Sequence, residues 1–180
     1  MPRYAAFLRG INITGRRVTG VALCSPLEEL GFTGVETFRA SGNVIFEADR
    51  EPVARMTGRI ENALRKALGY EVVTFLRTDR QFRTIAGSAP FGPADVEASK
   101  GKLQVSMLPA KPSAKARNEV LALATEADRL AFGDQELFWL PSGGTQESEL
   151  DGKAIEKLIG PTTMRTMGTV EQIAAKYFAG

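Results

Sequence analysis

Two turns in the sequence gather the residue types that recognise anions. The first turn follows an expected strand over residues 3–9 and carries Arg9, Gly10, Asn12, Gly15, Arg16 and Arg17. The second turn carries Arg39, Ser41, Gly42 and Asn43. Guanidinium groups form paired hydrogen bonds to phosphate or carboxylate, and glycine-containing turns expose backbone N–H groups to an anion. If the two turns lie together, they provide the parts of an anion or phosphate site.

The same residues also have a structural interpretation. Gly10, Gly15 and Gly42 can serve the turns alone, and the arginines can be solvated. The first turn lacks the glycine spacing of a P-loop or of the dinucleotide-binding fingerprint, so neither of these phosphate sites is predicted. The positions of the two turns in the fold decide whether they can form one anion site or are two ordinary turns.

The elements that hold the two turns follow a β-α-β-β-α-β order over residues 1–78. Strands are expected at 3–9, 35–39, 44–48 and 72–77. The first helix ends at Gly31 and begins either at Ser25 or near Thr19, in which case Pro26 lies inside it. The second helix runs from Pro52 to Gly69, and Thr78 and Gln81 form a capping box for a third. This order is typical of a ferredoxin-like split βαβ unit.

That topology predicts where the two turns lie. The first and second strands of such a unit run in the same direction, with the third strand antiparallel between them. The turn after the first strand and the turn between the second and third therefore emerge at the same end of the sheet. Arg9 and Asn43 are expected at that end.

The second half of the chain repeats the architecture without visible sequence identity. A linker is expected at 88–102, which is rich in Ser, Pro, Gly and Lys. Residues 103–180 then follow a β-α-β-β-α-α order. We therefore predict an α+β fold of two ferredoxin-like halves, at 1–87 and 103–180, with antiparallel sheets and helices on one face. Residues 72–77 are apolar on both faces, so the second face of the first sheet should be covered by the other half or by another subunit.

Composition excludes several classes of chemistry. The chain has 180 residues, no His and one Cys, which removes histidine-based catalytic dyads, histidine zinc sites, internal disulfides and cysteine-rich metal sites. Its net charge of +2 does not indicate nucleic acid or membrane as a partner. We expect no cofactor, no metal, no membrane contact, a cytoplasmic location, and a monomer or homodimer.

Several single features have structural interpretations. Cys24 lies on or near a helix start but has no His beside it in the sequence, so a packed thiol is favoured over a reactive one. Glu147, Glu149 and Asp151 could hold Mg²⁺, but acids at a helix start are commoner for dipole reasons. Trp139 is expected in the core. Arg165, in the turn expected at residues 162–166, offers a second anion contact near a helix N-terminus.

RNA recognition is a further possibility for a β-α-β-β-α-β unit. The RNA-recognition domain stacks bases on aromatic residues of its central strands. Here the two stacking positions of the third strand are Ser41 and Asn43, which are not aromatic. Loss of stacking removes most of the affinity for single strands, so RNA binding is the weaker hypothesis.

In three sequence motifs the chain resembles the bacterial domain of unknown function 1697 family. The resemblance rests on Arg9-Gly10-Ile11-Asn12, on Leu27–Phe32 and on Ser41–Phe46. It implies an α+β architecture with a ferredoxin-like first half, and it supplies no activity. The chain departs from the family pattern at Thr166-Met167-Gly168, where the family has Asn-Trp-Asn, and at Glu149, where the family has Lys.

The leading functional hypothesis is a protein that binds a phosphate-bearing or anionic small ligand. Its expected contacts are Arg9, Gly10, Asn12, Arg16, Arg39, Ser41, Gly42, Asn43 and Arg165. One alternative is an enzyme without His, which would use Arg, Asn and Ser for electrostatic stabilisation. Another is a protein–protein interaction module, in which the second face of the first sheet is a subunit interface.

Overall fold

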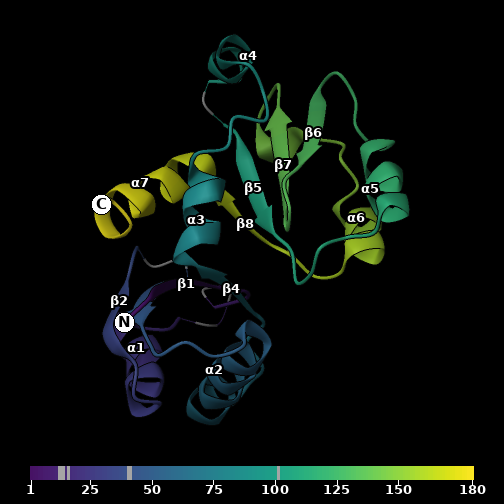
Figure 1. Cartoon of the computed structure of the whole chain (residues 1–180). Coiled ribbons are helices and arrows are strands. Elements are labelled where there is room, and N and C mark those ends of the chain that lie inside the picture. Colours follow the sequence, from purple (N-terminus) through teal and green to yellow (C-terminus); the bar gives the residue numbers. More distant parts are fainter. Residues whose placement is uncertain (12–14, 16, 40–41, 101) are drawn as a thin grey trace. The chain divides into compact units, whose positions relative to one another are not determined.

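The computed structural model describes residues 1–11, 15, 17–39, 42–100 and 102–180 (Figure 1). The chain divides into two compact units. The first unit comprises Met1–Arg83 and Ala175–Gly180, and the second comprises Thr84–Ala174. Among the described residues, no helix combines the length and the hydrophobicity that crossing a bilayer requires.

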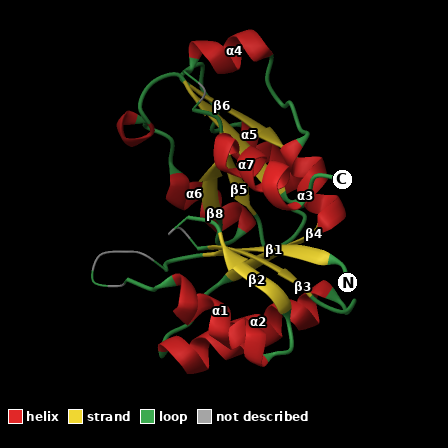
Figure 2. Cartoon of the chain, turned by 90° about the vertical axis from the view of Figure 1, so that its left-hand side faces the viewer, coloured by secondary structure: helices red, strands yellow, loops and turns green. Residues whose placement is uncertain are grey.

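The first unit contains a four-stranded antiparallel sheet. Its strands are β1 (Arg3–Leu8), β2 (Thr33–Thr37), β3 (Asn43–Glu47) and β4 (Thr74–Thr78), in the spatial order β2-β3-β1-β4. Helices α1 (Gly20–Glu29) and α2 (Val53–Leu68) connect the strands and lie together on one face of the sheet (Figure 2). This is the split βαβ arrangement expected from the element order, with β3 antiparallel between β1 and β2.

The two helices form as their sequence signals indicate. Helix α1 begins after Thr19, whose side chain accepts a hydrogen bond from the Ala22 N–H at 3.2 Å, so the earlier of the two expected starts is correct and Pro26 lies inside the helix. Helix α2 buries Met56, Ile60 and Leu64 and ends at Gly69, which has φ +82°. A glycine accepts this left-handed conformation without the steric penalty of a Cβ.

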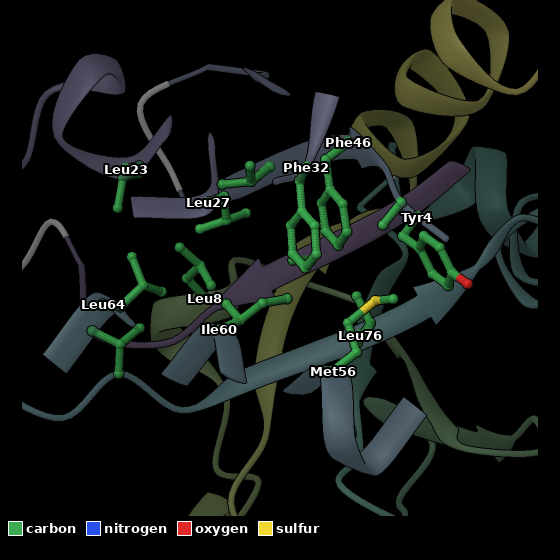
Figure 3. Packing of buried hydrophobic residues seen from close by; sticks show 14 of the residues in the cluster. Tyr4, Leu8, Leu23, Leu27, Phe32, Phe46, Met56, Ile60, Leu64 and Leu76 are labelled. Atoms are coloured by element: carbon green, nitrogen blue, oxygen red, sulfur yellow. The ribbon is translucent and has the colours of Figure 1, made fainter. Parts of the chain in front are cut away.

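The core of the first unit lies between the sheet and these two helices (Figure 3). Phe46 of β3 stacks on Tyr4 with ring centroids 5.5 Å apart and on Phe32 at 4.6 Å. Leu27 of α1 and Ile60 of α2 close the same cluster. Burial of this apolar surface is the main stabilising contribution to the unit.

The opposite face of the first sheet is covered within the first unit as well. Phe7 is fully buried there and stacks on Phe82, with ring centroids 5.9 Å apart. Phe82 belongs to α3 (Asp79–Ala86), which starts with the expected capping box: the Thr78 N–H donates to Gln81 Oε1 at 2.9 Å. Phe178 stacks on Phe82 in turn, at 4.7 Å. The second face is therefore covered, as expected. The expected source of the cover was the other half or another subunit, whereas α3 of the first half supplies part of it, together with the C-terminal segment.

The second unit repeats the topology. Its strands are β5 (Gln104–Met107), β6 (Asp128–Phe132), β7 (Glu136–Pro141) and β8 (Thr163–Thr166), in the order β6-β7-β5-β8. Helices α5 (Ala114–Leu121) and α6 (Gly152–Ile159) lie beside each other on one face (Figure 1). A short 3₁₀ turn, η1 (Thr145–Glu147), precedes α6, and α7 (Met167–Tyr177) ends the chain.

One expectation for the second half is wrong. Residues 163–166 form the edge strand β8, paired with β5, where a turn was expected. Only Thr163 of this strand is buried, so the sequence has no apolar pattern to reveal it. The expected linker, 88–102, lies inside the second unit and includes α4 (Pro93–Ala98). A salt bridge of 3.1 Å between Arg129 and Asp95 ties this helix to β6.

Candidate functional site

The end of β1 and the β2–β3 turn meet at one end of the first sheet. The Leu8 N–H donates to the Gly42 carbonyl at 2.8 Å, and Phe7 pairs with Asn43 across the two strands. Arg9 follows directly and donates its backbone N–H to Val73 at 3.0 Å. The topological prediction that these two turns lie together is therefore confirmed.

Asn43 holds the β2–β3 turn from within. The side-chain Nδ2 of Asn43 donates to the Phe38 carbonyl at 3.0 Å. The backbone carbonyl of Asn43 accepts the Phe38 N–H at 2.9 Å. The residue is only 1% exposed. Asn43 therefore stabilises the turn, and its side chain has no open surface on which a nucleic acid base could stack.

Three described residues of the two turns have the left-handed backbone conformation. Gly10 and Gly42 both have φ +73°, and Arg39 has φ +58°. Positive φ is uncommon for a residue other than glycine, and such strain is concentrated at functional positions. The Arg39 guanidinium lies 5.4 Å from the centre of the Phe38 ring, and the residue is exposed.

The N-terminus of α1 lies at the same end of the unit. Gly20, the first residue of α1, packs so closely on β2 that a Cβ built on it would lie 2.9 Å from Thr37 Oγ1. Thr37 directly precedes the turn that contains Arg39. The first turn of α1 contains no acidic residue, so no carboxylate there balances the partial positive charge of the helix N-terminus.

A hollow of about 410 Å³ adjoins this helix end. Arg17, Thr19 and Ala22 line it on one side, and Ala67, Leu68 and Tyr70 line it on the other. We call the end of the first sheet formed by Arg9, Gly10, Arg17, Arg39, Gly42 and the N-terminus of α1 the rim. Its polar contributions are guanidinium groups, a threonine hydroxyl and backbone N–H groups.

The sequence around the rim carries positive charge only. Residues 9–27 and 37–46 contain four arginines and no Asp or Glu. Of the expected site residues, Asn12, Arg16 and Ser41 lie outside the described residues, so their contribution stays a prediction. Arg9, Gly10, Arg39, Gly42 and Asn43 are brought together at one end of one sheet.

Arg165 belongs to the second unit and has a different environment. Its Nη1 donates to Thr163 Oγ1 and to the Met164 carbonyl, both at 2.8 Å. Burial lowers the pKa of the Arg165 guanidinium to about 10, which leaves it charged at neutral pH. This partly buried, charged side chain remains a candidate anion contact in the second unit.

Asp151, one of the acidic residues before α6, serves the helix. Asp151 caps it, because its Oδ1 accepts the Ala154 N–H at 3.0 Å. Across the described ranges, no group of three or more acidic or cysteine side chains has the arrangement of a metal site.

Sequence reasoning missed a polar cluster in the second unit. Trp139 was expected to be a simple core residue, yet its Nε1 donates to Asp128 Oδ1 at 2.8 Å. Ser148 Oγ donates to the same oxygen at 2.7 Å. One signal in the sequence could have indicated this cluster. Asp128 stands at the start of a strand, and a carboxylate buried in a strand usually has hydrogen-bond partners.

Cys24 is expected to react slowly with thiol reagents. It lies in the middle of α1, and burial, followed by the charges of Glu28 and Glu36, raises the pKa of its thiol. A raised pKa leaves less thiolate at pH 8 than in a free cysteine, and the thiolate is the reactive form. Alkylation by iodoacetamide, followed by mass spectrometry across pH, should show a rate below that of a cysteine-containing peptide. A faster rate would contradict this environment.

Comparison with known proteins identifies relatives but no activity. A family model described as "Protein of unknown function (DUF1697)" matches residues 1–138. No curated protein sequence matches the chain. The chain is similar in structure to the conserved bacterial protein SP0830 from Streptococcus pneumoniae, with a TM-score of 0.71 and 19% identity over 97% of each chain. At that identity the likeness is one of fold.

Proposed function

Because the chain belongs to the DUF1697 family, whose description assigns no activity, we propose a function from its own residues: the first unit binds a small phosphate-bearing anion at the rim. The observation that carries the proposal is the hydrogen bond of 2.8 Å from Leu8 to Gly42. It joins two turns that are more than thirty residues apart along the chain. The backbone segments that carry Arg9 and Arg39 therefore lie at one end of the sheet, and we propose that both guanidinium groups contact one ligand.

Three kinds of donor support an anionic ligand over a neutral one. Arg9 and Arg39 supply charge-assisted hydrogen bonds, which are about twice as strong as neutral ones. Gly10 and Gly42, both with positive φ, allow a ligand to approach the backbone without meeting a Cβ. The N-terminus of α1 adds the partial positive charge of the helix dipole.

We expect Arg9 to contribute to the affinity for a phosphate-bearing ligand and not to the stability of the fold. A thermal-shift screen with inorganic phosphate, nucleoside monophosphates and phosphorylated sugars provides the probe. For a probe that stabilises the protein, Arg9→Ala should weaken binding by roughly 10- to 100-fold, because a hydrogen bond to a charged group contributes about 1.5–3 kcal/mol. Arg39→Ala should have a similar effect, and both variants should melt near the temperature of the unmodified protein.

Arg55→Ala is the matched control. Arg55 lies near the start of α2, at the opposite end of that helix from the residues that line the hollow, and pairs with Glu51 at 3.5 Å. Its removal takes away the same charge without touching the rim, so affinity for the probe should be unchanged. Equal affinity in Arg9→Ala, Arg39→Ala and the unmodified protein would place the anion elsewhere.

A further inference from the structure

The second unit contains a cavity of about 570 Å³ between its sheet and the segment that leads into α6. This volume lies within the range of roughly 300–1,000 Å³ typical of small-molecule sites. Every residue that lines the cavity lies between Ser106 and Met164, so it belongs wholly to the second unit. The rim belongs to the first unit.

The floor of the cavity is apolar, and it includes the indole ring of Trp139, which a hydrogen bond holds in place. Leu130, Leu137, Trp139 and Ile155 belong to the core cluster of the second unit and also line the cavity. Asp128 holds the indole of Trp139 through the Nε1 hydrogen bond, and Ser148 joins the same carboxylate to the cavity wall. A ring held in this way is preorganised, so binding a flat ligand beside it costs little conformational entropy.

A buried hydroxyl faces this apolar space. Ser106 of β5 lines the cavity and is 5% exposed. Its hydroxyl can donate or accept a hydrogen bond, so a polar group on a ligand in the cavity can pair with it.

The charges around the cavity disfavour an anion. Lys153 is the one cation in its lining, and Asp151 and Glu156 are both acidic. Their carboxylates already accept backbone N–H groups, from Ala154 at 3.0 Å and from Thr162 at 3.4 Å. The lining thus combines an apolar floor, hydroxyl groups and a slight excess of negative charge.

We propose that this cavity binds a small uncharged aromatic compound, whose ring lies against Trp139 and whose single polar group hydrogen-bonds to Ser106. The apolar floor selects the ring, and the hydroxyl selects a polar group at one end. This ligand class differs from the phosphate-bearing anion proposed for the rim, so either site can be occupied alone.

The chain carries its own reporter for a binding experiment. Trp139 is the only tryptophan, so energy transfer from tryptophan to a bound dye reports on this cavity. The probe is N-phenyl-1-naphthylamine, an uncharged aromatic amine whose N–H can donate to Ser106. Saturable quenching of Trp139 with matching dye emission is the expected result. No saturable transfer in the folded chain would overturn the proposal.

Gly152→Phe tests the location. Gly152 lines the cavity, and a Cβ built on it meets no heavy atom within 4 Å, so a phenylalanine there adds a ring to the cavity lining without a clash at its Cβ. We expect affinity for the dye to fall by at least about tenfold. Thr145→Phe, on the exposed η1 turn that also lines the cavity, should have the same direction of effect if Gly152→Phe does not fold.

Gly58→Phe is the control for a glycine-to-phenylalanine change in a helix. Gly58 lies on the exposed face of α2 in the first unit, and its built Cβ also meets nothing within 4 Å. The affinity of the Gly58→Phe variant for the dye should equal that of the unmodified protein.

Ser106→Ala should weaken dye binding by roughly threefold through loss of one hydrogen bond. Unchanged affinity in Gly152→Phe and Thr145→Phe, or in Ser106→Ala, would overturn the proposed contacts.

Discussion

Asp128→Ala is expected to destabilise the second unit by about 3 kcal/mol, because a buried indole N–H and a hydroxyl would lose their shared acceptor. Asp128 is 5% exposed and accepts hydrogen bonds from Trp139 at 2.8 Å and Ser148 at 2.7 Å. The loss should appear in urea unfolding followed by Trp139 fluorescence. The emission of the folded variant should also shift, because the indole loses its hydrogen-bond partner.

Asp128→Asn separates the contribution of the two hydrogen bonds to stability from the contribution of the negative charge. The amide oxygen can occupy the position of Oδ1 and accept both hydrogen bonds, although a neutral acceptor is weaker than a carboxylate. We expect it to cost roughly 1 kcal/mol, clearly less than Asp128→Ala. If the two variants unfolded at the same urea concentration as the unmodified chain, these hydrogen bonds would have no net effect on stability.

Phe75→Glu is expected to unfold the chain and not merely to dissociate a dimer. Phe75 is 2% exposed and pairs in the sheet with Phe7, which is fully buried beneath Phe82. Burying an unpaired carboxylate there should cost more than about 4 kcal/mol, a large part of the 5–15 kcal/mol that stabilises a typical domain. Circular dichroism should show loss of secondary structure, and light scattering should show an expanded or aggregated chain.

Val53→Glu provides the comparison. Val53 is the first residue of α2 and is 37% exposed, so the same carboxylate there stays in water and interacts favourably with the helix N-terminus. Stability should change by less than about 0.5 kcal/mol. A folded, monomeric Phe75→Glu variant of a protein that is otherwise dimeric would instead support the hypothesis of a subunit interface on this face.

Local signals determined most of the fold. Thr78 and Gln81 form their capping box, Gly31 and Gly69 follow the helices they end, and the sequence order of the first half specifies its sheet. Each signal acts over a few residues: a cap satisfies N–H groups within one turn, and glycine removes a local steric penalty. The placement of Arg9 beside the β2–β3 turn then followed from topology alone.

Only the tertiary structure decided the features that depend on distant partners. Residues 163–166 form a strand because β5 offers them hydrogen bonds, since the segment has no apolar alternation of its own. The side chain of Asn43 turned inward to the Phe38 carbonyl, which residue type alone does not indicate. The cavity beside Trp139 exists because Ser106, Trp139 and Ile155 come together from separate elements, and a cavity is defined by side chains that no short stretch of sequence contains.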